Sequence, residues 1–164
     1  MQEILTNSQI NQKTNRLAHQ LLENCFDQEE IYIGGIGGNG IILAEQLVKV
    51  IKQHDPIKIN LFKITINKDK PWSDKIELSI DINKMKNGYI VLVDDVVNSG
   101  KTMQYALIEI LKFPTKEIKT VALVDRKHRR FPIKADFVGM TLSTTLKERV
   151  EVDLTGQEMK AFLV

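Results

Sequence analysis

Residues 90–102 read IVLVDDVVNSGKT, and this stretch decides the fold. Its apolar half predicts a strand over residues 89–93 that is buried on both faces, like the strands of a parallel sheet. Asp94 and Asp95 then stand at the carboxyl end of this strand, and a turn of small residues leads into a predicted helix, Met103–Leu111. A strand that passes through a ligand-binding turn into a helix is the basic unit of an α/β fold.

The turn after the acids is suited to a phosphate group. Ser99, Gly100 and Thr102 stand at the start of the predicted helix, where backbone N–H groups and the helix dipole attract anions. Asp94 and Asp95 cannot bind the same phosphate because like charges repel, but their carboxylates can accept hydrogen bonds from hydroxyl groups. The stretch therefore predicts a site for a phosphorylated ribose.

Two alternatives compete with this interpretation of the turn. Gly100-Lys101-Thr102 resembles the end of a nucleoside-triphosphate P-loop, but that motif requires a glycine five residues before Gly100, where Asp95 stands. The P-loop is therefore excluded. A plain strand, turn and helix with an acidic cap remains open as the simpler alternative.

The rest of the chain alternates between helical and strand patterns. Helices are predicted for Ser8–Asn24, Ile41–Gln53 and Met103–Leu111, and strands for Ile31–Ile33, Ile57–Ile66, Thr120–Val124, Ala135–Val138 and Arg149–Leu154. This alternation predicts an α/β fold in one domain, residues 1–164, with a mostly parallel sheet flanked by helices on both faces. The loops that begin at Gly34, Asp94 and Asp125 each follow a strand and are expected to share one edge of the sheet. The polar segment Asn67–Lys75 is predicted to be a mobile loop.

A second glycine motif suggests a different ligand. Residues 35–40, Gly-Ile-Gly-Gly-Asn-Gly, satisfy the dinucleotide-binding pattern G-x-G-x-x-G between a strand and a helix. That motif also requires an acid at the end of the next strand, where Thr65, Ile66 and Asn67 stand instead. A dinucleotide site remains an alternative, beside a flexible glycine turn and a turn that holds pyrophosphate through its amides.

Composition excludes several classes of protein. With 43% hydrophobic residues, 27% charged residues and a net charge of +2, the chain has no general attraction for nucleic acids or membranes. No apolar run has the length of a membrane span or the character of a signal sequence. Cys25 is the only cysteine, which rules out an intrachain disulfide and, with only three histidines, argues against a structural zinc site. We therefore expect a cytoplasmic protein.

Residues 90–102 closely resemble the signature with which type I phosphoribosyltransferases bind 5-phosphoribosyl-1-pyrophosphate (PRPP): a hydrophobic strand, two acids and a Thr/Ser-Gly-x-Thr turn. Residues 124–139, VDRKHRRFPIKADFVG, are similar to a stretch of the bifunctional pyrimidine-operon regulator/uracil phosphoribosyltransferase family. Residues 16–19, 40–44 and 148–152 resemble other parts of that family, so the resemblance covers nearly the whole chain.

The resemblance implies a type I phosphoribosyltransferase-like fold with a small hood built from the two ends of the chain. It implies a reaction in which uracil and PRPP give uridine monophosphate and pyrophosphate, with Mg²⁺ carried by PRPP and no direct metal ligands. A homodimer or larger homo-oligomer is also implied, as is closure of the loop Asn67–Ile80 over the site. The implied site residues are Asp94 and Asp95 for catalysis; Val96, Val97, Asn98, Ser99, Gly100, Lys101 and Thr102 for PRPP and its phosphate; Gly37, Gly38, Asn39 and Gly40 for the pyrophosphate loop; and Val138 and Gly139 for the base.

The chain departs from the family at several positions. Gly37-Gly38-Asn39 replaces Lys-Thr-Arg, and the loss of the arginine removes a charge that would neutralise pyrophosphate. Lys68-Asp69 replaces Arg-Asp on the mobile loop, Asn98 replaces a tyrosine, and Met140 replaces a lysine. These changes bear on catalytic rate and base choice. Gly37-Gly38-Asn39 favours the alternative function, a PRPP- or nucleotide-sensing regulator of pyrimidine genes that binds RNA with little catalysis, while the intact stretch from Asp94 to Thr102 supports both functions.

The regulatory alternative requires an RNA-binding surface. Residues 126–130, Arg-Lys-His-Arg-Arg, form a basic cluster. A solvated basic loop is the simpler alternative, since no exposed aromatic residues or known RNA-binding module accompany the cluster. The resemblance assigns a face for RNA or for dimerisation to Arg16, His19, Arg126, His128 and Arg129.

Overall fold

The computed structural model describes all 164 residues and contains two separate sheets. The larger sheet has six strands in the order β4-β3-β2-β5-β6-β7, and only β4 runs antiparallel to its neighbour. Its strands are β2 (Glu30–Ile36), β3 (Lys58–Thr65), β4 (Glu77–Leu78), β5 (Tyr89–Val97), β6 (Glu117–Asp125) and β7 (Phe137–Thr141). The predicted α/β fold with a mostly parallel sheet is confirmed.

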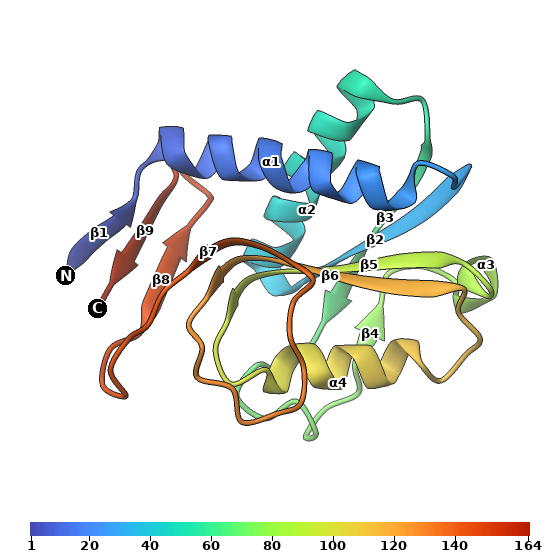
Figure 1. Cartoon of the computed structure of the whole chain (residues 1–164). Helices are drawn as coiled ribbons and strands as arrows, with labels where there is room; N and C mark the ends of the chain where they lie inside the picture. The colour runs from blue at the N-terminus through green and yellow to red at the C-terminus, as the bar shows by residue number, and fades with distance from the viewer.

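Helices cover both faces of this sheet (Figure 1). The helices are α1 (Asn7–Cys25) and α2 (Gly37–His54) on one face, α4 (Lys101–Ile110) on the other, and the short α3 (Ile82–Met85) before β5. Each face has its own apolar core: Leu17 and Leu47 belong to the cluster under α1 and α2, and Met103 and Ala106 to the cluster under α4. The apolar run of residues 90–93 is fully buried because β5 feeds alternate side chains into both cores.

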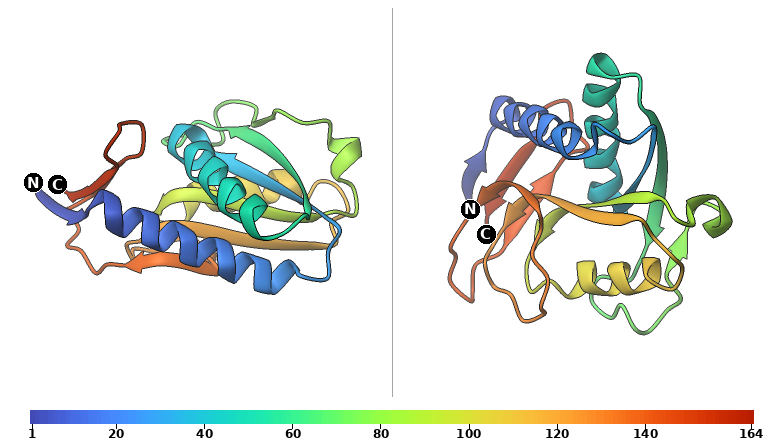
Figure 2. Two further views of the ribbon diagram at one scale, coloured as in Figure 1. Left: turned by 90° about the horizontal axis from the view of Figure 1, so that it is seen from above. Right: turned by 45° about the vertical axis from the view of Figure 1, so that its right-hand side comes forward.

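The second sheet forms the predicted hood. It is antiparallel, in the order β1-β9-β8, and consists of β1 (Gln2–Leu5), β8 (Val150–Asp153) and β9 (Lys160–Leu163). Figures 1 and 2 show the two termini side by side at this end of the molecule. Strand β8 contacts β5 of the main sheet, which places the hood next to the predicted site.

The predicted end of the strand Ile31–Ile33, just before Gly34, is wrong. Strand β2 continues through Gly34 to Ile36, and α2 begins at Gly37 rather than at Ile41. A glycine is needed at position 34 because a Cβ there would lie 2.4 Å from the ring of Phe62. The expected pyrophosphate loop, residues 37–40, is therefore the first turn of α2, entered through a Gly37 φ of +67°.

Other boundaries also differ from the sequence pattern. Strand β5 extends to Val97, so both acids are strand residues, because β6 continues to pair with β5 as far as Val97. Strands β1, β4 and β9 and helix α3 were not predicted, since elements of two to four residues are too short to show a periodicity. No helix combines the length and the apolarity that a membrane crossing requires.

Candidate active site

The carboxyl ends of β2, β5 and β6 meet at one edge of the sheet, as predicted, and a pocket of about 310 Å³ opens there. The predicted acid pair and phosphate turn all face this one cavity. The loop after β3 and the hood also contribute, and the resemblance implied a place near the site for that loop. The lining residues are Lys68, Asp69, Asp94, Asp95, Val96, Val97, Asn98, Ser99, Gly100, Lys101, Thr102, Met103 and Val150.

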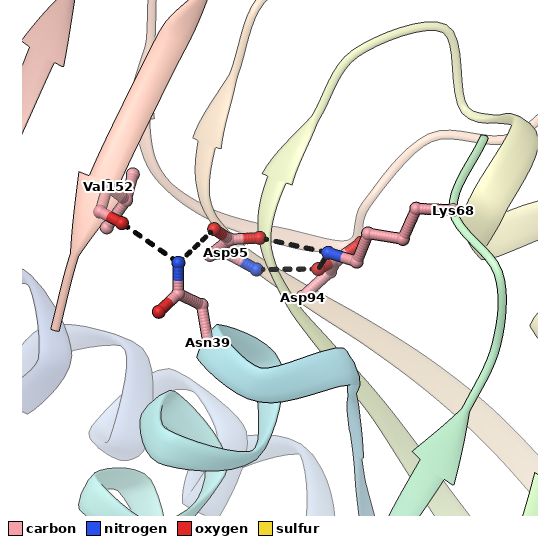
Figure 3. A network of polar contacts seen from close by, with 5 residues as sticks. All are labelled: Asn39, Lys68, Asp94, Asp95 and Val152. Atoms are coloured by element: carbon pink, nitrogen blue, oxygen red, sulfur yellow. Dashed lines mark hydrogen bonds and ion pairs between the residues drawn. The ribbon is translucent and has the colours of Figure 1, made fainter. Parts of the chain in front are cut away.

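Two buried carboxylates stand at the base of this pocket. Asp94 and Asp95 are 2% and 8% exposed, and the ammonium of Lys68 lies 2.9 Å from Asp94 Oδ1 and 3.4 Å from Asp95 Oδ1 (Figure 3). Neighbouring strand residues normally point to opposite faces of a sheet, but these two reach the same lysine near the end of β5. A buried pair of like charges is costly without a counterion, and Lys68 supplies one.

Asn39 connects the acid pair to the hood. Its Nδ2 donates to Asp95 Oδ2 at 3.0 Å and to the carbonyl of Val152 at 2.9 Å (Figure 3). Because Asn39 lies on the first turn of α2, one amide joins α2, β5 and β8. The Asp95 carboxylate is thus held from one side by an amide and from the other by the Lys68 ammonium, which fixes its orientation.

The turn between β5 and α4 has the geometry of an anion site. Gly100 adopts a φ of +87°, and α4 begins directly after it without a side-chain cap. A Cβ on Gly100 would lie 2.7 Å from Ile133 Cγ2, so the turn requires glycine for space as well as for conformation. Ser99 Oγ accepts a hydrogen bond from the N–H of Lys101 at 3.3 Å. The other first-turn amides have no side-chain partner and can bind an anionic group.

The segment after β3 is docked on this turn. The ammonium of Lys101 donates to the carbonyl of Asp69 at 2.9 Å and lies 5.4 Å from the centre of the Trp72 ring. Trp72 in turn faces Tyr105 of α4, with 6.4 Å between ring centres. The side chain of Lys101 therefore contacts this loop while it lines the pocket, and its role in binding PRPP stays a prediction.

The pKa values of the two acids are shifted in opposite directions. Burial raises the pKa of Asp94 to about 7, against the attraction of Lys68. Burial acts in the same sense on Asp95, but Lys68 and the hydrogen bonds from its neighbours, including Asn39, hold the pKa of Asp95 below its usual value. Near neutral pH the pair therefore carries between one and two negative charges.

The raised pKa of Asp94 predicts a pH-dependent stability. An unfolded aspartate titrates near pH ~3.9, so between about pH 4 and pH 7 the folded state holds a proton that the unfolded state has lost. The free energy of unfolding should therefore fall as the pH rises through this window. In Asp94→Asn this contribution is absent, so its melting temperature relative to wild type is expected to rise between pH ~5 and pH ~7.5. A constant difference in melting temperature would contradict the assigned pKa.

Arg126 is buried and bonded within the chain, so its predicted place on an RNA-binding or dimer face stays a prediction. It is 8% exposed, and its guanidinium donates to Asn98 Oδ1 at 2.9 Å, to Thr144 Oγ1 at 3.1 Å and to the carbonyl of Glu148. It also lies 3.2 Å from His128 Nδ1, which places the imidazole proton on Nε2, 2.7 Å from the Thr144 carbonyl. A buried guanidinium must have its donors satisfied, and here it ties the phosphate turn to the segment before β8.

The residues predicted to read a base lie outside the pocket. The guanidinium of Arg16 donates to the carbonyls of Val138 at 3.2 Å and of Gly139 at 2.5 Å. These carbonyls are therefore engaged by α1, and Arg16 has a structural contact in addition to any partner-binding role. His19 is exposed on the same helix, with its ring centre 4.8 Å from that of His54.

Packing explains the first and last glycines of the G-x-G-x-x-G pattern. A Cβ on Gly35 would lie 2.3 Å from Ile41 Cα, and one on Gly40 would lie 2.8 Å from the carbonyl of Val93. Strand β3 ends at Thr65 without the acid that a dinucleotide site requires. Lys68 was not assigned to the site from the sequence, where its signals were its place on the predicted mobile loop and its position in place of the family's arginine.

Comparisons with known proteins agree with this geometry. The family described as "Phosphoribosyl transferase domain" matches residues 1–154. The chain is 33% identical over 158 residues to the "Bifunctional protein PyrR" of Macrococcus caseolyticus, covering 92% of this chain and 90% of that protein. It is 34% identical over 163 residues to the protein of the same name from Synechocystis, covering 93% and 89%.

Solved structures show the same fold at lower sequence identity. The hypoxanthine phosphoribosyltransferase of Trypanosoma cruzi superposes with a TM-score of 0.79 at 15% identity, covering 99% of this chain and 95% of that one. A hypoxanthine-guanine phosphoribosyltransferase from Bacillus anthracis gives a TM-score of 0.73 at 21% identity, covering 87% and 83%. At these identities the likeness concerns the fold alone.

Proposed function

Since this chain belongs to the phosphoribosyl transferase domain family, we propose that it transfers the phosphoribosyl group of PRPP to a nucleobase, with uracil as the first candidate, and releases pyrophosphate. One observation carries this proposal: a single pocket combines two buried acids with an uncapped helix start. That combination suits a ligand with sugar hydroxyls beside a phosphate. The resemblance of residues 124–139 to the pyrimidine-operon family supports uracil as the base.

Each part of the pocket then has a chemical role. The backbone of residues 98–102 would hold the 5′-phosphate at the start of α4. Asp94 and Asp95 would accept hydrogen bonds from the ribose hydroxyls and stabilise the positive charge that develops on the ribose as pyrophosphate leaves. The first turn of α2, Gly37–Gly40, would face the pyrophosphate. That the backbone of Val138 and Gly139 reads the edge of the base remains a prediction. It requires these residues to bind the base while their carbonyls accept hydrogen bonds from Arg16.

We expect Mg²⁺ to enter with PRPP rather than to occupy a site of its own. No three His, Cys, Asp or Glu side chains are grouped to hold a metal, and both acids already bond to Lys68. Their carboxylates nevertheless suit a hydrated Mg²⁺ held mainly by phosphates, because this ion prefers oxygen ligands and keeps several waters. When bound, the ion would supply positive charge to the pyrophosphate.

A nucleotide-sensing regulator that binds RNA is the second candidate, and a second pocket favours it. This pocket of about 380 Å³ adjoins the phosphate turn at Asn98 and Ser99 and is lined by the exposed Lys127, Arg129 and Arg130. Basic side chains beside a phosphate turn suit a polyanion, whose affinity would fall steeply with salt. A homo-oligomer and a cytoplasmic location are expected under either function.

A ligand panel followed by an activity assay tests the proposed function. PRPP with Mg²⁺ and uridine monophosphate should each raise the melting temperature by several degrees, because both bind the folded state alone, whereas NAD should not. A shift with NAD alone would refute the proposal. Uracil-dependent release of pyrophosphate should follow, measured beside other bases. Binding of PRPP without turnover on any base would favour the regulator.

A further inference from the structure

Lys68 lies between the acid pair and the glycine turn. Its ammonium bonds to Asp94 at 2.9 Å and to Asp95 at 3.4 Å. On the α2 side, a Cβ placed on Gly37 would be 3.0 Å from Lys68 Cε and 3.7 Å from its Nζ. The side chain is 41% exposed and lines the pocket, so a ligand can reach it. One flexible cation is therefore bonded to the acids and lies close to the glycine turn.

The glycine turn has no cation of its own. Residues 34–40 read GGIGGNG and contain no charged side chain. The start of α2 offers amides and a helix dipole worth about half a charge, which is less than the charge of a pyrophosphate. A pyrophosphate above this turn would also lie beside two carboxylates, and at such short range in a buried site like charges repel strongly. A positive side chain at this place would therefore stabilise a bound pyrophosphate, in addition to the Mg²⁺ that enters with PRPP.

We propose that Lys68 is the pyrophosphate-binding cation of this chain, which neutralises Asp94 and Asp95 while the pocket is empty and turns toward the phosphates above Gly37 when PRPP enters. This inference rests on the proposed function and names the residue that replaces the missing basic side chains of the turn. The movement is short because the ammonium already lies beside Gly37. It needs only side-chain rotations, since lysine carries its charge on a flexible stem.

This exchange couples the two halves of the ligand. When Lys68 turns to the pyrophosphate, both acids become free to accept hydrogen bonds from the ribose hydroxyls. Ribose 5-phosphate has no pyrophosphate to attract the lysine, so it must compete with Lys68 for the acids. PRPP should therefore bind far more tightly than ribose 5-phosphate, and the difference should depend on Lys68.

Calorimetric titration of variants tests the assignment, with PRPP plus Mg²⁺, inorganic pyrophosphate and ribose 5-phosphate as separate probes. In Lys68→Gln, affinity for PRPP and for pyrophosphate should fall about 10- to 100-fold, as for the loss of a charge-assisted hydrogen bond. Affinity for ribose 5-phosphate should stay the same or increase, because its competitor is gone. Lys68→Arg retains the charge and should keep PRPP affinity within about threefold. The matched control, Lys70→Gln, removes the same charge from an exposed position on the same loop and should change nothing beyond about twofold.

Two outcomes would overturn the inference. An equal loss of affinity for ribose 5-phosphate and PRPP would make Lys68 a counterion of the acids only, and unchanged affinity for all three probes would remove it from the site. Loss of PRPP affinity in Lys68→Arg as large as in Lys68→Gln, with both variants folded by their melting curves, would also contradict it. Failure of the wild-type chain to bind PRPP would refute the proposed function instead, so the two failures are distinguishable.

Discussion

Replacing Asp94 and Asp95 together with asparagine is expected to lower turnover at least about a thousandfold while leaving the fold intact. Asparagine keeps the shape of each side chain but removes the negative charge that would face the reacting ribose. Loss of one preorganised electrostatic contact typically lowers rates by a factor on the order of 10²–10³, and this variant loses two. The fold should survive because Lys68, their shared counterion, is 41% exposed and can turn toward solvent once its partners are neutral.

Uracil-dependent release of pyrophosphate measures this effect, and melting curves establish that the variant is folded. The matched control is Asp74→Asn, which makes the same chemical change at an exposed position on the loop above the pocket and should retain activity within about twofold. Undiminished turnover in the double variant would refute the role assigned to the two acids. Unfolding of the double variant would show that the acid pair with Lys68 is a structural ion cluster.

The largest effect on stability is expected for Gly35→Ala. A methyl group there would lie 2.3 Å from Ile41 Cα, 2.6 Å from Ile41 N and 2.7 Å from the carbonyl of Gly40. All three atoms belong to the backbone of α2, so no side-chain rotation relieves the clash and the helix must move away from β2. Such overpacking costs about 3 kcal/mol, which corresponds to a loss of roughly 6–12 °C in melting temperature for a chain of this size.

Gly38→Ala provides the matched control for this prediction. The same methyl group at this position meets no atom within 4 Å, and Gly38 lies in the first turn of α2. Alanine is the better helix former, so the melting temperature should be unchanged or slightly higher. Equal stability of the two variants, measured by thermal denaturation, would show that β2 and α2 do not pack as closely as the structure places them.

The central strand and its turn could be predicted because their signals are local. Burial on both faces leaves the uninterrupted apolar run of residues 90–93, and the carboxylates of Asp94 and Asp95 follow it directly along the chain. Gly100 marks a turn that only glycine fits. Because the carboxyl ends of parallel strands share an edge, the turn that contains Asn39 could be expected near the acids. In the structure Asn39 is hydrogen-bonded to Asp95.

Lys68 and Arg126 could not be assigned because their roles depend on partners far away in the sequence. Lys68 is 26 residues from Asp94, and a lysine on a polar loop reads as a solvated side chain. Arg126 stands in a basic cluster, and nothing in its neighbours indicates the buried bond to Asn98, 28 residues away. The start of α2 at Gly37 was missed for another reason: glycine is a poor helix former, and here tertiary packing outweighs that propensity.

The strand order β1-β9-β8 has a consequence for biosynthesis. Strand β1 leaves the ribosome well before its partner β9, residues 160–163, so these two can pair only after the intervening segment has been translated. The strands of the main sheet lie between residues 30 and 141 and can associate earlier, since nascent chains fold as segments emerge. The edge of the main sheet that carries Asp94 and Asp95 can thus form during synthesis, whereas the hood forms last. A translating chain that pauses before β9 would leave Leu5 of β1, which is buried in the folded chain, without its full packing.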